Sequence, residues 1–422
     1  MRQLLLALAL FPLPAFAEDA ASELEMFGTP ELVTQAASTE TARAEKKTLG
    51  FSGSVTSVME DAVYGSSDSL NTYILGNLLL DARLKNGVKA FANLETSYYP
   101  KTRQTTSTLR ELFVDFNLGD RVYFRTGKQV LQWGRCYLWN PTDLVNIEKI
   151  PFVPKVGSRE GAYGLKLHVP FGTAYNIYGF LDTGSAAAGR ELAGALKFEL
   201  LAGRTEMAFS GWTKRNRNPV FGYDVSSRLG DVDIAGEVSA AGRDNGRYIR
   251  DNNGTLETFK KGTDWPLKAA VNFSKGFRLG NFNDRLTVTS EFFYNQSGYV
   301  KTPFRDKKLY AFSGPLSSVL PAGTKGLYLL GNGLYDSNYL GRHYGALFTS
   351  VSRFIITDLT LNTNYIHNFN DSTGALSAGV TYKNLNDFNA GCLLLAPLGP
   401  ADGEYTFSGA KLFAQLTAGL SF

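Results

Sequence analysis

Basic side chains gather at one long segment between predicted strands, and they are the first residues that suggest chemistry. Lys149, Lys155 and Arg159 lie in or beside residues 131–158, and Arg125 lies just before that segment. Rings of basic side chains favour anions where they line a pore. We therefore expect this segment to narrow a pore and to give it a basic local lining. The alternative is a solvated external loop whose charges only keep it soluble.

Two carboxylates precede this segment in the alternating stretch LRELFVDFNL at 109–118. Glu111 and Asp115 share the face opposite to the leucine and valine side chains, so they should point inward. Arg125, on the next segment, should lie level with Asp115. Opposite charges on neighbouring strands are common and stabilise a sheet by roughly 0.2–1 kcal/mol. A wall ion pair is therefore favoured over a binding site, although all three residues are candidates for a pore lining.

The alternation creates a conflict at Lys128. Continued strictly from Val122 and Phe124, it would direct Lys128 toward lipid, which costs about 2–4 kcal/mol near the bilayer midplane. A bulge at Gly127 would remove the conflict, and so would a position near the rim of the barrel. The sequence leaves both solutions open.

The chain offers little for catalysis or for nucleic-acid binding. Its three histidines, His168, His343 and His367, lie on separate predicted strands and form no metal-ligand spacing. We therefore predict no enzyme activity, no metal and no cofactor, and we interpret each histidine as an aromatic-like wall residue. A formal charge of +4 on 422 residues gives no argument for nucleic acid. Cys136 and Cys392 leave a single disulfide open.

The elements that must position these residues are strands. From about residue 48 onward, segments of about 10–13 residues alternate apolar with polar or small side chains, as transmembrane strands do. We expect about eighteen of them, within a range of about 16–20, because a further hairpin could lie within 297–340. Every second connection is short and rich in turn residues. These short connections are KNG at 85–87, LGDR at 118–121, PFGT at 170–173, LLAGR at 200–204, LGD at 229–231, GNFND at 280–284, TD at 357–358 and NLND at 384–387.

Alternating short and long connections place all short turns on one side of the sheet. That is the plan of a closed antiparallel transmembrane barrel with short periplasmic turns and long external loops. The last residues, KLFAQLTAGLSF, also alternate, and we expect them to pair with the first strand near residues 48–56 so that no edge remains free. The predicted location is therefore an outer membrane, with several passes through lipid and lipopolysaccharide.

The first residues indicate secretion. Arg2, an apolar run over 4–13 and the sequence Ala15-Phe16-Ala17 predict a signal peptide over residues 1–17. Residues 18–47 would then form a periplasmic extension, and residues 48–422 the barrel. The extension could dock a periplasmic or inner-membrane partner or enter the pore; the alternative is a disordered or partly helical tail.

The whole mature chain resembles porin-type outer-membrane channels of Gram-negative bacteria. Its most distinctive stretch, GKQVLQWGRCYLWNPTDLVN at 127–146, is similar to a pattern in substrate-specific porins and alginate-export-like barrels. The positions that match are Trp133, Gly134, Asn140, Pro141 and Asp143, for which the resemblance implies a structural role. The final Phe422 resembles the C-terminal signal that the barrel-assembly machinery recognises.

We conclude from the sequence that the chain is a channel for passive or facilitated diffusion of small polar solutes, with a preference for anions. One alternative is an export conduit that works with a partner through residues 18–47. Another is a surface protein that the barrel only anchors. The sequence identifies no solute, and it leaves oligomerisation open.

Overall fold

The computed structural model describes residues 49–65, 67–84, 87–146, 161–184, 186–252, 255–301, 303, 335–384 and 387–422, with the backbone alone described over 250–252 and 255–257. The predicted signal peptide and the predicted extension at 18–47 lie outside these residues. Lys149, Lys155 and Arg159 do as well.

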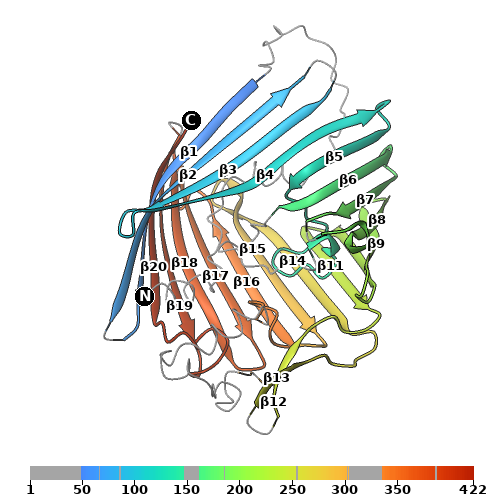
Figure 1. The fold of residues 1–422 in the computed structure, drawn as a ribbon. Coiled ribbons are helices and arrows are strands. Elements are labelled where there is room, and N and C mark those ends of the chain that lie inside the picture. The colour runs from blue at the N-terminus through green and yellow to red at the C-terminus, as the bar shows by residue number, and fades with distance from the viewer. Residues whose placement is uncertain are drawn as a thin grey trace.

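Eighteen antiparallel strands form one closed sheet, as predicted (Figure 1). They are β1 (Leu49–Val63), β2 (Asp68–Arg83), β3 (Lys89–Tyr99), β4 (Gln104–Leu118), β5 (Val122–Gln129), β6 (Ala162–Phe171), β7 (Tyr175–Asp182), β8 (Ala193–Ala202), β9 (Thr205–Lys214), β10 (Val220–Leu229), β11 (Val232–Ala241), β14 (Leu267–Leu279), β15 (Phe282–Asn295), β16 (His343–Val351), β17 (Leu359–Asn368), β18 (Thr373–Lys383), β19 (Phe388–Leu398) and β20 (Leu412–Ser421). A separate hairpin, β12 (Tyr248–Asn252) and β13 (Thr255–Phe259), lies within the long connection between β11 and β14.

The barrel closes where the last strand pairs with the first. Ser54–Val63 of β1 lie opposite Leu412–Ser421 of β20. The ladder continues to the final residue, because the backbone N–H of Gly53 donates to the Phe422 carbonyl at 2.9 Å and the reverse bond has the same length. The alternation of the final residues therefore belongs to a closing strand, and the sheet has no free edge.

All eight predicted short turns join strands at the end of the barrel where β20 ends. Several of these turns contain a residue with positive φ, such as Gly119 at 60° and Asp120 at 53°, which suits tight hairpins. The strand ends that the longer connections join lie at the opposite end, from which the β12–β13 hairpin projects (Figure 1). Short turns mark the periplasmic end in outer-membrane barrels, so the hairpin belongs to the external end.

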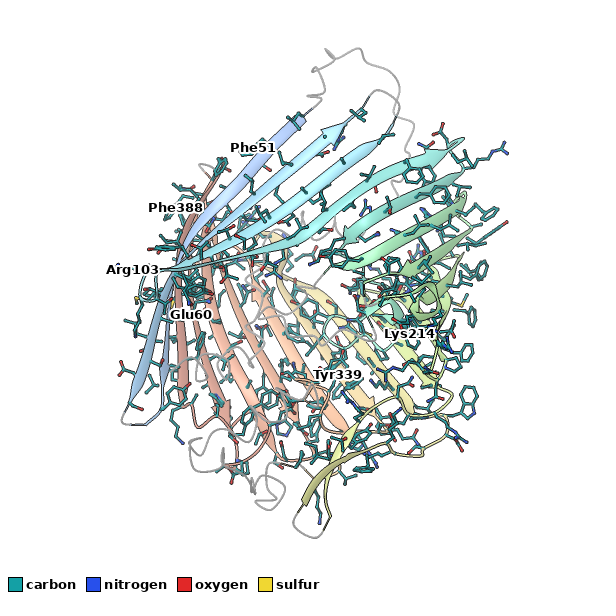
Figure 2. All side chains as sticks on the ribbon, viewed as in Figure 1. Phe51, Glu60, Arg103, Lys214, Tyr339 and Phe388 are labelled. Atoms are coloured by element: carbon teal, nitrogen blue, oxygen red, sulfur yellow. The ribbon has the colours of Figure 1, made fainter. Side chains whose placement is uncertain are left out.

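The outside of the wall is apolar. On β4, Leu112 is 52% exposed and Leu118 is 69% exposed, whereas Phe113, which points inward, is 5% exposed. Figure 2 shows side chains on both sides of the wall along its whole circumference. A closed barrel with an apolar outer band satisfies its backbone within the sheet and exposes its apolar side chains to lipid, so this is a multi-pass barrel of the outer-membrane type. Within the described residues, no helix has the length and apolar character needed to cross a bilayer.

The structure resolves the conflict at Lys128 without a shift of register. β4 and β5 stay paired residue by residue, with Phe113 opposite Gly127 and Leu112 opposite Lys128. Instead Gly127 adopts a φ of +123°. Lys128 is 5% exposed, and its ammonium lies 5.1 Å from the centre of the Tyr163 ring. The sheet thus accommodates Lys128 without an extra bulge residue, through an unusual glycine conformation near the end of β5.

Substitution of Gly127 tests this conclusion. A Cβ atom at residue 127 would lie 2.2 Å from the carbonyl oxygen of Leu112, and φ is strained for any other residue. We expect Gly127→Ala to destabilise the barrel by about 1–3 kcal/mol, measured as a lower urea midpoint in tryptophan fluorescence. Gly230→Asn is the matched control, because Gly230 has a φ of +62° and open space around its Cβ position. Equal midpoints for the two variants would contradict the explanation.

Candidate functional site

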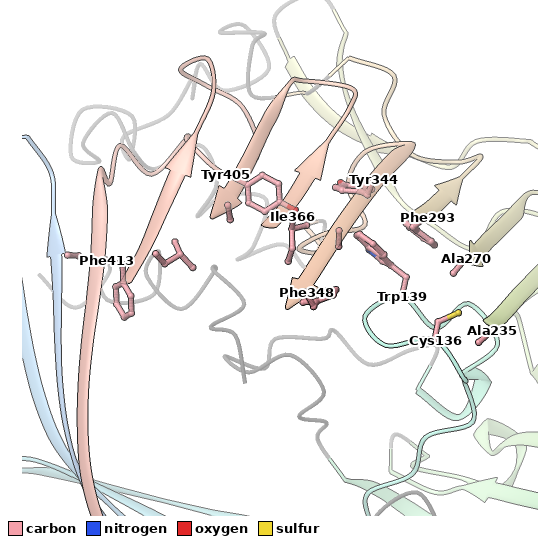
Figure 3. Close-up of a cluster of buried hydrophobic side chains, with 14 residues drawn as sticks. Cys136, Trp139, Ala235, Ala270, Phe293, Tyr344, Phe348, Ile366, Tyr405 and Phe413 are labelled. Carbon is pink, nitrogen blue, oxygen red and sulfur yellow. The ribbon is translucent and has the colours of Figure 1, made fainter. Parts of the chain in front are cut away.

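The segment 130–146 leaves the wall after β5 and crosses the interior of the barrel. We call it the inward loop. Its Trp139 is fully buried and stacks on Phe293 of β15, with ring centres 5.5 Å apart and planes 5° from parallel. Trp139 also contacts Tyr344 of β16 at 5.8 Å, and Cys136 lies near β11 (Figure 3). The inward loop therefore spans from β5 to the strands on the far side of the lumen.

Wall carboxylates hold the backbone of the inward loop. The first is Glu111 of β4, which accepts a hydrogen bond from the backbone N–H of Val130 at 2.9 Å. The second is Glu237 of β11, which accepts from the backbone N–H groups of Cys136 at 2.7 Å and Thr142 at 3.0 Å. The same carboxylate accepts from the backbone N–H of Arg135 and from the Thr142 hydroxyl.

Glu291 of β15 is the third carboxylate, and it binds the tip of the loop. It accepts from the backbone N–H groups of Tyr137, Leu138 and Trp139, at 2.9, 3.0 and 2.6 Å. The side-chain amide of Asn272 donates to it at 3.1 Å. Glu291 is fully buried. Hydrogen bonds to a charged group contribute about 1.5–3 kcal/mol each, so these carboxylates fix the path of the loop.

A buried guanidinium adds a second set of anchors. Arg135 ion-pairs with Asp224 of β10 and Glu206 of β9, and it donates to Glu199 of β8 at 2.6 Å. Burial acts to lower the pKa of Arg135, but the charge of Asp224 and the bonds to these acids raise it above its usual value. The ammonium of Lys197 lies 3.4 Å from Asp224 and donates to the Trp133 carbonyl at 2.6 Å. Two cations are thus paired with three acids, so the cluster carries no excess of positive charge.

The motif residues of the sequence analysis fold the inward loop back on itself. The backbone N–H of Trp133 donates to the Asp143 carboxylate at 3.2 Å. A Cβ at Gly134 would lie 2.2 Å from the side-chain oxygen of Asn140, so the two ends of the motif are in close contact. Asn140, Pro141 and Asp143 are all buried.

A second layer ties the loop tip to the external end of the barrel. The Trp139 indole N–H donates to the Asn338 carbonyl at 2.8 Å, and the Asn338 backbone N–H donates to the carboxyl of Glu404 at 2.9 Å. Glu404 also accepts from the Tyr344 hydroxyl and the Asn368 amide, both at 2.7 Å. Burial, and to a lesser degree the nearby charge of Asp371, raises the pKa of Glu404 to about 8.

The expected ion pair on β4 and β5 is present. Arg125 donates to both carboxylate oxygens of Asp115, at 2.6 and 2.8 Å, and its guanidinium lies 3.8 Å from the centre of the Phe113 ring. Lys166 of β6 is the register partner of Arg125. The structure thus brings Arg125 and Asp115 together, whereas Glu111 binds the inward loop instead of a solute.

The histidines pack as aromatic wall residues. His168 stacks on Tyr178 at 4.5 Å, and His343 lies 5.3 Å from Tyr294. His367 lies 4.8 Å from Phe369. Both cysteines are free: Cys136 is buried in the inward loop and Cys392 is exposed on β19.

The sequence analysis missed Arg135, Glu237 and Glu291 as site residues. The alternation placed the two glutamates on polar faces, and this was the only signal. Their partners in the inward loop lie 95 to 154 positions away in the chain, which no local pattern can reveal.

Glu291→Gln tests the anchoring of the loop tip. The amide keeps the shape of the side chain but replaces a charged acceptor by a neutral one and adds a donor that faces three backbone N–H groups. We expect a loss of about 2–4 kcal/mol in stability and a larger, noisier single-channel conductance, because the tip is released into the lumen. Asp233→Asn is the control, since Asp233 forms an exposed pair with Arg228 at 2.6 Å. Unchanged conductance in Glu291→Gln would contradict the anchoring.

The raised pKa of Glu404 predicts a pH dependence. A carboxyl group whose pKa rises on folding contributes stability that is fully present below its unfolded pKa of about 4.3 and is lost as the pH rises through its folded value. The thermal midpoint of the wild type should therefore fall, relative to that of Glu404→Gln, between about pH 5 and pH 9, by an amount equivalent to a few kcal/mol. Parallel profiles would show that Glu404 does not titrate in this range.

The comparisons with known proteins agree with this architecture. No family model matches the chain, and no curated protein does. Among solved structures, the chain is similar to OccK2 (OpdF) of Pseudomonas aeruginosa in complex with glucuronate, at 10% identity and a TM-score of 0.53, covering 89% of this chain and 98% of that one. OccK8 (OprE) of the same organism gives 9% identity, a TM-score of 0.53, and coverage of 89% and 98%. OccAB1 of Acinetobacter baumannii gives 11% identity, a TM-score of 0.52, and coverage of 89% and 96%. At these identities the likeness concerns the fold, so the chain has the fold of the Occ outer-membrane channels.

Proposed function

We propose that the protein is a porin-like channel for passive or facilitated diffusion of small polar solutes. The observation that carries this proposal is an eighteen-stranded closed barrel that the anchored inward loop crosses. Barrels of this size are wide enough for an aqueous channel. A loop held by buried carboxylates narrows such a channel at a fixed place, which is what selection among small solutes requires.

We further propose that the channel prefers anions. Around Arg135 and Lys197 the three acids Asp224, Glu199 and Glu206 outnumber the two cations, so this half of the lumen offers no free positive charge to an anion. On β4 to β6 the balance differs, because the cross-strand row of Asp115, Arg125 and Lys166 holds two cations and one acid.

The remaining candidates and one solved structure are consistent with this preference. Lys149, Lys155 and Arg159 belong to the continuation of the inward loop, outside the described residues, and we propose them as further parts of the basic lining. The OccK2 structure was solved with glucuronate, a small sugar acid. A solute of that class, small, polar and anionic, is the one we propose here.

Measurements of conductance and ion selectivity in a planar bilayer test both the proposed channel function and the proposed anion preference. We expect steady conductance steps from the purified barrel and a reversal potential, under a salt gradient, with the sign of an anion-preferring pore. Lys166→Gln should reduce this preference, and the triple change of Lys149, Lys155 and Arg159 to Glu should abolish or reverse it. The matched control is Lys275→Gln on β14, because Lys275 faces outward beside Phe277.

Two results would overturn parts of the proposal. An unaltered reversal potential in both variants would reject the anion preference but leave the channel intact. Folded barrels without conductance would reject open diffusion and favour a conduit that a partner opens through residues 18–47.

A further inference from the structure

The outer wall carries a hollow that the proposed transport function does not use. It lies across β6 to β10 and has a volume of about 480 Å³, within the range of roughly 300–1,000 Å³ that is typical of ligand pockets. Its lining is almost entirely apolar and is formed by residues 165, 167, 179–181, 194–196, 211–213, 219 and 221. We call it the outer groove.

Alternating large and small side chains create the outer groove. The cross-strand register places five outward residues in one row around the barrel: Leu167, Gly179, Leu196, Gly211 and Phe221. Leucine or phenylalanine thus flanks each glycine. In the adjacent row toward the strand ends, Leu181 lies opposite Gly194 and Gly194 lies opposite Thr213. Leu196 lies between Gly179 and Gly211 in the first row, and its side chain is 66% exposed.

The backbone does not require these glycines. Gly179, Gly194 and Gly211 are absent from the residues with positive φ. A Cβ at Gly194 would meet nothing within 4 Å, and at Gly179 and Gly211 the nearest atoms would lie at ordinary contact distances of 3.6 and 3.7 Å. Glycine in a strand costs about 0.5–1 kcal/mol relative to alanine. Glycines retained without a conformational reason mark a place where another group approaches the strand closely.

The outer groove lies at the external end of the barrel. The short turns after β6 and β8 are at the periplasmic end, so residues 162–167 of β6, 193–196 of β8 and 211–214 of β9 are at the other end. Lys214, labelled in Figure 2, is the last residue of β9. The apolar lining therefore faces the outer leaflet of the membrane.

Positive charge follows directly beyond the apolar lining. Lys214 at the end of β9 is followed by a loop that begins with Arg215-Asn216-Arg217 and contains Pro219, which itself lines the groove. The neighbouring loop after β7 adds Arg190, and both Arg190 and Arg215 are exposed.

The acids in the β7–β8 connection are engaged locally. Asp182 accepts from the backbone N–H of Gly184 at 2.8 Å, and Glu191 accepts from that of Ala187 at 3.0 Å. Lys214, Arg215, Arg217 and Arg190 outnumber these two acids, so the mouth of the outer groove carries a net positive charge next to an apolar surface that suits hydrocarbon.

We propose that the outer groove binds one acyl chain of a phosphorylated, multiply acylated glycolipid of the outer leaflet, of the lipid A type. The chain lies over Gly179, Gly194 and Gly211, and the arginines of the loop after β9 contact the phosphate. An acyl chain is the occupant that fits, because it is narrow enough for single-residue gaps and because the cations stand where the head group of the outer leaflet would lie.

Native mass spectrometry tests the proposal. The full-length protein is purified from outer membranes in mild detergent and titrated with lipid A. We expect the wild type to retain one lipid A at concentrations where Gly194→Leu/Gly211→Leu, which fills the groove, binds at least about tenfold more weakly. Gly236→Leu is the matched control, because Gly236 also faces outward and a Cβ there has only an ordinary contact with Val225 at 3.7 Å. Arg190→Gln/Arg215→Gln leaves the wall untouched and should weaken binding in a salt-dependent manner.

Each alternative outcome is distinguishable. Equal lipid A binding by the filled variant and the Gly236 variant would overturn the proposal. Loss of a dimer or trimer in the filled variant, without a change in lipid binding, would overturn it in favour of a second copy of the chain as the occupant. Equal retention of a phospholipid without phosphorylated sugars would overturn the assignment to lipid A. If the filled variant does not fold, as judged by its heat-dependent electrophoretic mobility, the arginine variant decides: unchanged affinity would overturn the proposal.

Discussion

Backbone hydrogen bonding is the constraint on which this structure depends. Lipid offers no partner for a backbone N–H or C=O, so the wall must pair all of them within itself. The ladder from β1 to β20 does so, including the bonds between Gly53 and Phe422 that carry it to the last residue. The inward loop leaves this ladder at Val130 and runs through a buried region, where its N–H groups need other partners. Glu111, Glu237 and Glu291 provide them, which explains why the wall holds inward carboxylates at these places, two of them buried.

This use of charge divides the lumen into two halves. On β8 to β15 the acids bind Arg135, Lys197 and backbone N–H groups. These contacts hold the loop in place. A buried charged group with complete partners is costly to separate from them and is therefore a poor contact for a passing solute. On β4 to β6 the side chains Asp115, Arg125 and Lys166 pair with neighbours in the wall and hold no loop backbone. Selectivity that depends on charge should thus reside on that side and on the continuation of the loop.

The strands could be predicted because each depends on local chemistry. A period of two defines the faces of β4, and glycine and aspartate at its hairpin define its end. The turn predicted at 118–121 lies between the observed end of β4 at Leu118 and the start of β5 at Val122. The β12–β13 hairpin was not predicted, because it stands outside the closed sheet. At Lys128 the alternation revealed the conflict but not the observed solution, because a glycine φ is invisible in the alternation. The partners of Arg135 lie 64 to 91 positions away, and only the path of the inward loop brings them together.

The outer groove shows a further limit of the alternation, and it connects the two faces of the wall. Period two says that Gly179, Leu196 and Gly211 point outward, but only the register between strands places them in one row. Next to Leu196 along β8, Lys197 points inward to Asp224 and to the carbonyl of Trp133. Three of the strands that bear the groove, β8, β9 and β10, are therefore also strands that anchor the inward loop, through Arg135 and Lys197. Packing against the outer face of these strands restrains the backbone that carries Lys197, Glu199 and Asp224. The lipid-facing side and the lumen-facing side of this wall are therefore mechanically coupled.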